Sequence, residues 1–159
     1  MIEHTLVLVK PDGVYRGLIG EVLMRFERAG LKIVGLKMIW IEKDFAKKHY
    51  HAHLQKGFYP GLEQYITSGP VVAMVVEGVK AVEVVRKIVG PTEPEKAIPG
   101  TIRGDYCHVN VAHADEGHKS VFNIIHASGT VNEAREEILL WFDPPELSNY
   151  KRAGEEWMQ

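Results

Sequence analysis

The hydrophobic period of the chain switches repeatedly between strand spacing and helix spacing, and most switches coincide with glycine or proline. Residues 4–10 (HTLVLVK) have the pattern of a short buried strand, which ends at 11–13 (PDG). Residues 18–30 then repeat apolar residues at helical spacing, with Gly30 as the C-terminal cap. The same alternation predicts the remaining elements: a strand at 31–41, short helices at 44–55 and 61–69, a strand at 71–78, a helix at 80–90, a strand at 121–126, and a helix that opens at Thr130 and ends before Pro144.

This order of elements predicts an α+β fold. It is the order of the ferredoxin-like βαββαβ unit with added helices, so we expect an antiparallel sheet sandwich with helices over one face. Residues 92–120 are rich in proline and glycine and are expected to form a long loop before the last strand. Since no internal repeat or low-complexity linker divides the chain, residues 1–159 are expected to form a single domain.

Composition narrows the class of protein. The chain has 19 Lys and Arg against 21 Asp and Glu, a formal net charge of −2, which argues against a general nucleic-acid binder. Its one cysteine, Cys107, cannot form an intrachain disulfide and points to a reducing compartment. The N-terminus lacks a secretory signal pattern, and the longest apolar run, 71–76, is far short of the ~20 residues of a membrane span. We therefore expect a cytoplasmic globular protein without a membrane partner.

The stretch 123–133 (NIIHASGTVNE) places a histidine between an apolar strand and the start of a helix. His126 is either a core histidine satisfied by the backbone or a reactive group, and the small residues 127–129 leave room for a bulky ligand to reach it. The free amides of a helix N-terminus favour an anion at this place. Asn123 lies upstream, and Glu137 is placed to accept one imidazole N–H, which would make the other ring nitrogen nucleophilic.

Basic residues elsewhere suggest which anion this is. Arg103 lies between glycines in the long loop, Arg86 lies on the preceding helix, and Thr92 follows that helix. Two guanidinium groups and a hydroxyl suit a polyphosphate, although each arginine alone is more often a solvated surface charge. Lys10 ends the first strand. The sequence contains no P-loop, no G-x-G-x-x-G fingerprint after a strand and no protein-kinase motif, so a triphosphate would be held in another way.

Five stretches together resemble blocks of the nucleoside diphosphate kinase family, in the family's order. They are 9–30 (VKPDGVYRGLIGEVLMRFERAG), 58–78 (FYPGLEQYITSGPVVAMVVEG), 99–107 (PGTIRGDYC), 123–128 (NIIHAS) and 137–142 (EILLWF). The resemblance implies a phosphotransferase that moves the γ-phosphate of a nucleoside triphosphate to a nucleoside diphosphate, by a ping-pong mechanism through a phosphohistidine. It also implies Mg²⁺ carried by the nucleotide phosphates rather than by protein ligands, and a homo-oligomer, with a hexamer favoured over a tetramer.

The resemblance also assigns roles to individual residues. His126 would be the nucleophile, Glu137 would orient its ring, and Tyr50 would lie close to it. Eight residues would contact the nucleotide: Lys10 and Asn123 at the sugar 3′-hydroxyl and nearby phosphate oxygens (Lys10 also counting as catalytic), His53, Arg86, Thr92 and Arg103 at the phosphates, and Phe58 and Leu62 at the base. A base held by stacking would explain broad base tolerance, because every base has a π-face.

Three departures from the family pattern stand out. The chain reads His-Ala-Ser-Gly at 126–129, where the family commonly has His-Gly-Ser-Asp. We expect Thr130 to cap the following helix instead, in a capping box with Glu133, at a cost of about 0.5–2 kcal/mol at most. The segment 108–122 is longer than in many relatives, and Gly57 stands where the family often has proline, which would leave that loop less rigid.

Two other classes of function remain open. The histidines permit a structural or hydrolytic zinc site, because His49 and His53 have i, i+4 spacing and His108, His113 and His118 lie in the longer segment. The second alternative is a nucleotide-binding protein that has kept the fold but lost the transfer. A chelator would strip the first of its ion, and the second would bind ADP without becoming phosphorylated.

Overall fold

A four-stranded antiparallel sheet forms the centre of the molecule. The computed structural model describes residues 1–117 and 119–158. The strands are β1 (Ile2–Val9), β2 (Lys32–Ile39), β3 (Val71–Val79) and β4 (Ile125–Ala127), in the spatial order β2-β3-β1-β4. All three pairings, β1 with β3, β1 with β4 and β2 with β3, are antiparallel. The predicted α+β fold with ferredoxin-like strand order is therefore confirmed.

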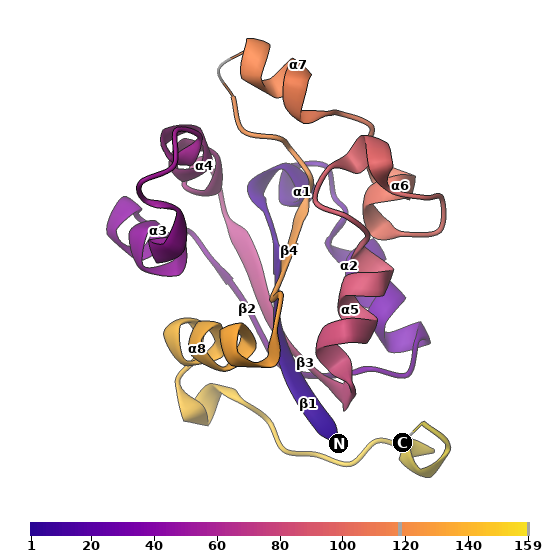
Figure 1. Cartoon of the computed structure of the whole chain (residues 1–159). Helices are drawn as coiled ribbons and strands as arrows, with labels where there is room; N and C mark the ends of the chain where they lie inside the picture. The colour runs from indigo at the N-terminus through magenta and orange to yellow at the C-terminus, as the bar shows by residue number, and fades with distance from the viewer. Residues whose placement is uncertain (118, 159) are drawn as a thin grey trace.

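Helices cover both faces of this sheet, so the expectation of a single covered face is wrong. Leu6 and Leu8 of β1 belong to one core cluster, and Val7 and Val9 belong to the other; all four are fully buried. Because alternate residues of a strand point to opposite faces, a strand that is apolar on both faces requires cover on both. Figure 1 shows α3 (Lys43–His49), α4 (Tyr59–Ile66) and α8 (Val131–Trp141) on one side, and α2 (Ile19–Arg28) and α5 (Ala81–Val89) on the other.

The helix α2 ends as the glycine at its end predicts. Gly30 has φ +81°, the left-handed region that glycine enters without strain. Its N–H bonds to Glu27 O at 3.0 Å, and the N–H of Leu31 bonds to Phe26 O at 3.0 Å, which is the Schellman arrangement. The chain leaves the helix at this point and enters β2.

The region expected to be a long loop contains three short helices, η2 (Pro94–Lys96), α6 (Ile102–Tyr106) and α7 (Val111–Glu116). Side-chain caps start the last two, because Thr101 accepts from the N–H of Gly104 and Asn110 accepts from the N–H of His113. Residues 11–13, where the first predicted strand ends, begin a short helix, α1 (Pro11–Tyr15).

The last strand is shorter than predicted. Ile124 has φ +54°, a left-handed conformation that interrupts an extended backbone, so β4 begins only at Ile125. The chain after α8 forms η3 (Pro144–Glu146), runs beside β2, where Ser148 N–H donates to Val34 O at 2.7 Å, and reaches η4 (Glu155–Trp157). None of the helices in the described ranges is long and apolar enough to span a bilayer.

Candidate active site

A cavity of about 1050 Å³ opens at the end of the sheet where β1 finishes and β4 begins. It is lined by residues from η1, α4, α5, α6, α7, β4 and α8 and from the segments that join the elements, including Lys10 directly after β1. Ten of the residues singled out from the sequence line it, and they are Lys10, Tyr50, His53, Phe58, Leu62, Arg86, Thr92, Arg103, Asn123 and His126. The remaining one, Glu137, lies behind His126.

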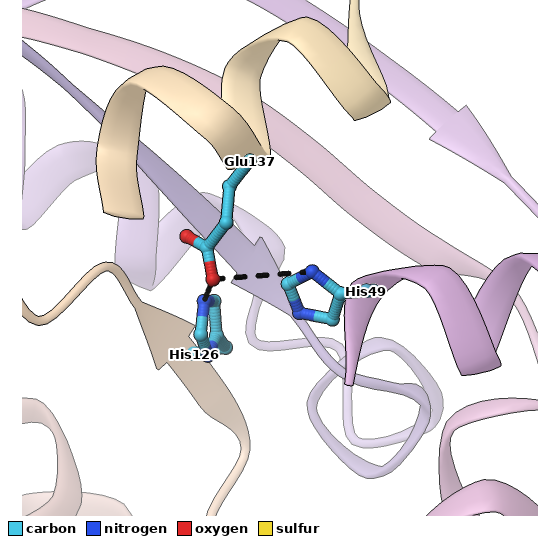
Figure 2. A group of neighbouring side chains, drawn as sticks. All are labelled: His49, His126 and Glu137. Atoms are coloured by element: carbon cyan, nitrogen blue, oxygen red, sulfur yellow. Dashed lines mark hydrogen bonds and ion pairs between the residues drawn. The ribbon is translucent and has the colours of Figure 1, made fainter. Parts of the chain in front are cut away.

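The histidine is held by the carboxylate that the sequence suggested. His126 sits on β4 opposite Leu8 of β1, and its Nε2 lies 2.9 Å from Glu137 Oε1 (Figure 2). Ser128 Oγ donates to the other oxygen of Glu137 at 2.5 Å, which fixes the carboxylate. The side chain of His126 is 21% exposed. Since Nε2 faces the carboxylate, the ring proton belongs on Nε2 and Nδ1 keeps a lone pair for a substrate.

Lys10 and Asn123 form a buried polar pair beside the histidine. Lys10 Nζ donates to Asn123 Oδ1 at 2.8 Å, and Asn123 Nδ2 donates to the backbone oxygen of Thr92 at 2.9 Å. Burial, together with repulsion from Arg103, lowers the pKa of Lys10 to about 7. An anion bound next to Lys10 would favour the charged form and draw a proton to it.

Arg103 differs from the exposed phosphate clamp that its place between glycines suggested. It is only 6% exposed, and it donates to three backbone oxygens: Gly90 at 2.9 Å, Asn123 at 3.3 Å and Ile125 at 2.6 Å. Burial lowers its pKa to about 10, so it stays charged at neutral pH. Since a guanidinium has five N–H donors, Arg103 ties the start of β4 to the end of α5 and still faces the cavity with donors to spare.

The opposite wall of the cavity carries aromatic rings. Phe58 is 52% exposed, and the centroid of His53 lies 5.7 Å from it and 6.3 Å from that of Tyr50. Leu62 is 8% exposed and belongs to the hydrophobic core as well as to the wall. The buried Tyr50 hydroxyl has no hydrogen-bond partner among the described residues, and burial raises the pKa of Tyr50. This wall presents flat apolar surface.

Sequence reasoning missed two contributors to the site. Ser128 holds Glu137, and its position two residues after His126, in line with the strand, was the available signal. Residues of α7 and the segment after it, among them Val111, Asp115 and Lys119, line the cavity mouth. Their signal was the extra length of segment 108–122, which the sequence alone could not place.

The start of α8 carries the cap expected there. Thr130 Oγ1 accepts from the N–H of Glu133 at 3.1 Å, as a capping box requires. The carboxylate of Glu133 reaches back to the N–H of Gly129 at 2.8 Å rather than to that of Thr130. A threonine therefore does cap the helix, and the side chain of Glu133 closes the turn where the family pattern has aspartate.

The histidines do not gather as a zinc site of the kind considered above. Among the described residues, one group of three lies within metal-binding distance, His49, His126 and Glu137, with ligand atoms within 4.8 Å of one another. His108 and His113 are not part of it, and His118 falls outside the described residues. The facing atoms of the group are already engaged in hydrogen bonds, since His126 Nε2 pairs with Glu137 and Trp141 Nε1 donates to His49 Nδ1 at 3.1 Å. The arrangement favours a hydrogen-bonded network.

Comparisons with known proteins identify the family of the chain. The family model described as nucleoside diphosphate kinase matches residues 3–147. A nucleoside diphosphate kinase of Pyrococcus furiosus is 53% identical over 97% of this chain and 91% of its own length, and that of Archaeoglobus fulgidus is 51% identical over 99% and 97%.

Solved structures show the same similarity. A transition-state mimic of the nucleoside-diphosphate kinase of Borrelia burgdorferi, with bound vanadate and ADP, has a TM-score of 0.96 and 46% identity, covering 99% of this chain and 96% of that one. A halophilic nucleoside diphosphate kinase of Halobacterium salinarum, in complex with CDP, has a TM-score of 0.88 and 45% identity, covering 99% and 98%. With a matching family model, relatives at about half identity over nearly all its length and the same fold, the chain belongs to the nucleoside diphosphate kinase family and is an enzyme of nucleotide phosphoryl transfer.

Proposed function

We propose that the chain moves the γ-phosphate of a nucleoside triphosphate to a nucleoside diphosphate through a phosphohistidine at His126, in two half-reactions at one site. The observation that carries the proposal is the 2.9 Å contact between His126 Nε2 and Glu137 Oε1, at the wall of a cavity large enough for a nucleotide. A neutral imidazole with its proton on Nε2 has a lone pair on Nδ1, and this nucleophilic nitrogen can attack a phosphorus atom.

In the first half-reaction, the lone pair of Nδ1 attacks the γ-phosphorus. The bond from that phosphorus to the bridging oxygen breaks, and its electron pair leaves with the nucleoside diphosphate. The Nε2–H stays in place, and the charge that develops on the ring is balanced by Glu137. In the second half-reaction, a terminal phosphate oxygen of another nucleoside diphosphate takes the phosphoryl group, and the imidazole returns to its neutral form.

The basic end of the cavity is proposed to bind the phosphates. Lys10, Arg86 and Arg103 supply positive charge, and His53 and the hydroxyl of Thr92 supply hydrogen bonds, while Lys10 and Asn123 reach the sugar hydroxyl. The cavity lining includes two carboxylates, Asp115 on α7 and Glu133 on α8, but neither is among these proposed phosphate-binding residues. Mg²⁺ would therefore be held by phosphate oxygens rather than by the protein. When bound, the ion neutralises charge on the transferred group.

The aromatic wall is proposed to hold the base by stacking, with broad base tolerance. Phe58 offers an exposed ring, Leu62 lines the cavity with apolar atoms, and Tyr50 belongs to the same wall. Stacking accepts any base because each has a π-face. The structures of two relatives contain nucleotides with different bases, ADP in one and CDP in the other, which supports the proposal.

We propose a homo-oligomer: the family resemblance favours a hexamer over a tetramer, and apolar side chains at the edge of the sheet support a contact between copies of the chain. Leu36, Met38 and Trp40, in and just after the edge strand β2, are 51%, 58% and 61% exposed. Apolar side chains along a sheet edge mark an interaction surface. Light scattering on a size-exclusion column measures the assembly directly. The lone thiol Cys107 supports a location in the reducing cytoplasm.

Intact-protein mass spectrometry tests the proposed chemistry. After brief exposure to ATP and Mg²⁺ without acceptor, we expect one added phosphoryl group, which is discharged when a nucleoside diphosphate is added. The His126→Ala variant should bind ATP and gain no mass. Phosphorylation of that variant to the same extent would sink the assignment of His126, and unmodified wild-type protein with bound ATP would indicate a relative that has lost its chemistry.

A further inference from the structure

A second histidine, His49, packs directly against His126 and has no part in the function proposed above. It is the last residue of α3, its side chain is 0% exposed, and its ring lies edge-on to that of His126 with the centroids 4.8 Å apart. Figure 2 shows its Nδ1 turned toward Glu137, the carboxylate that also faces His126. Glu137 Oε1 thus has two imidazole nitrogens near it, His126 Nε2 at 2.9 Å and His49 Nδ1 at 3.9 Å.

The indole of Trp141 decides between these two nitrogens. Trp141 is the last residue of α8, and its Nε1 donates to His49 Nδ1 at 3.1 Å. Because an indole nitrogen is only a donor, His49 Nδ1 must be the acceptor, and the ring proton of His49 must be on Nε2. A nitrogen that accepts has no proton to give to Glu137. The 3.9 Å approach is therefore not an ion pair, and the carboxylate stays with His126.

The position of His49 is unfavourable for stability. Its Nε2 is buried and has no hydrogen-bond partner among the described residues. A buried N–H without an acceptor loses the free energy of its hydration, so stability alone would favour an apolar side chain at this position. The edge-on packing against His126 and the bond from Trp141 indicate that the ring serves the geometry of the site.

The surroundings hold His49 in the neutral form. Burial lowers the pKa of His49 well below its usual value, and repulsion from neighbouring cations adds to this. The titratable groups that face His49 come from five places in the fold: His126 on β4, Glu137 on α8, Lys10 after β1, Tyr50 after α3, and His51 and His53 on η1. Among them, Glu137 is the group whose charge attracts a proton to His49.

We propose that Trp141 is a positioning residue, which reserves the Glu137 carboxylate for His126 by keeping His49 Nδ1 unprotonated. Without the indole donor, the ring stays neutral but its proton can move from Nε2 to Nδ1, and an N–H on Nδ1 can donate to Glu137 Oε1, now 3.9 Å away, and draw the carboxylate away from His126. The effect on rate rests on the proposed phosphotransfer. The effect on the protonation of His49 does not rest on it, so the two can fail separately.

The Trp141→Phe variant tests the proposal, because phenylalanine keeps an aromatic ring in place and removes the N–H. Long-range ¹H–¹⁵N spectra of the imidazole rings should show His49 as the Nε2–H tautomer in the wild type, and a population of the Nδ1–H tautomer in the variant. Single-turnover phosphorylation by ATP and Mg²⁺ should be about tenfold slower in the variant than in the wild type, a size expected for contacting residues in one network. The matched control is Phe45→Leu, because Phe45 packs edge-on against Trp141 with centroids 4.8 Å apart but leaves the indole N–H intact.

A second variant separates positioning from a loss of packing. In the Trp141→Phe background, His49→Phe removes both ring nitrogens, so no N–H competes for Glu137 and the rate should recover most of the way to wild type. A rate that stays low in the double variant, or an equal loss in the Phe45→Leu control, would overturn the proposal. If the wild type is not phosphorylated at all, the proposed function fails, and the spectra alone decide: a His49 that stays in the Nε2–H tautomer in Trp141→Phe overturns the role of Trp141.

Discussion

The two walls of the cavity are built differently. Around His126, the polar side chains are already engaged with one another: Glu137 pairs with His126 and Ser128, and Ser128 also accepts from the N–H of Leu6 at 3.2 Å. The opposite wall carries Phe58, which is exposed, together with Tyr50, His53 and Leu62, and exposed side chains of α7 extend it at the cavity mouth. The hydrogen bonds of the first wall are therefore already made without a nucleotide, whereas the second wall has exposed apolar surface that a nucleotide can cover.

This difference matches the proposed tasks of the two walls, which are phosphoryl transfer and recognition of the base. Phosphoryl transfer depends on position and charge, so a side chain that must be ordered during the reaction adds an entropic barrier. Recognition of a base by stacking depends on area rather than on fixed hydrogen bonds, so a mobile ring suffices. Substitutions in the His126 wall should therefore change the rate of transfer, and substitutions in the opposite wall should change the affinity.

The largest effect is expected from Glu137→Gln. The amide keeps the size of the side chain and can still accept from His126 Nε2, but it has no charge to balance the ring during transfer. We expect phosphorylation of His126 to slow by about 10²-fold, measured in a single turnover with ATP and Mg²⁺. Nucleotide affinity should change little. The control is Glu136→Gln, an exposed neighbour on the same helix, and equal losses in both variants would contradict the role of Glu137.

The next largest effect is a difference in stability between variants of the two arginines of the site. Arg103→Ala removes three side-chain hydrogen bonds to backbone oxygens, so the free energy of unfolding should fall by about 3 kcal/mol, measured by urea denaturation. Arg86 is exposed on α5, so Arg86→Ala should leave the free energy of unfolding within about 0.5 kcal/mol of wild type and raise the KM for ATP. Equal stability of the two variants would mean that Arg103 is not a structural tie.

A smaller effect is expected from Phe58→Ala in the opposite wall. Loss of a stacking ring should raise the KM for nucleotides about tenfold and leave kcat nearly unchanged, since stacking is worth roughly 1–3 kcal/mol per base. The increase should be similar for ADP and CDP as acceptors. A loss confined to one base would show that this wall reads hydrogen bonds on the base edge, and a fall in kcat would remove the contrast between the walls.

The sequence predicted which residues come together at the site better than it predicted the hydrogen bonds that they make. The strand period, the small residues after His126 and the spacing to Glu137 are local patterns, and the structure places these residues together. The assignment of hydrogen bonds is not local. Arg103 looked like a surface clamp because the sequence does not show which backbone oxygens it will meet, and the burial of those oxygens depends on the packing of α5 against β4.

The prediction of the fold was likewise correct for the elements and their order and incomplete for how they pack. The element order and the antiparallel sheet follow from hydrophobic period and end signals. The cover on both faces was missed, although the alternation of Leu6 and Leu8 with Val7 and Val9 already required it. The helices of segment 92–120 were missed because proline and glycine obscured two capping residues, Thr101 and Asn110.

The smallest effect is expected from Gly129→Asp, which restores the aspartate of the family pattern at the edge of the His126 wall. A Cβ at Gly129 would lie 2.7 Å from Glu133 Oε2, the far end of a flexible side chain that can move aside. The new carboxylate would gain from the N-terminus of α8, a favourable term of about 0.3–1 kcal/mol, and would repel the carboxylate that now bonds to the N–H of Gly129. These terms oppose each other, so the free energy of unfolding should stay within about 0.5 kcal/mol of wild type and the transfer rate within about twofold.

The Glu133→Gln background separates the two opposing terms, which are attraction to the N-terminus of α8 and repulsion by the Glu133 carboxylate. With the repulsion removed, the same Gly129→Asp change should stabilise the protein by about 0.5–1 kcal/mol, measured by urea denaturation. Gly129→Asn serves as the uncharged control in both backgrounds. If Gly129→Asp instead raises the transfer rate severalfold with Glu133 intact, a carboxylate at this position acts on His126 itself, and Glu133 is only a partial substitute for it. A neutral result would mean that the pairing of Glu137 with His126 does not depend on how the turn before α8 is closed.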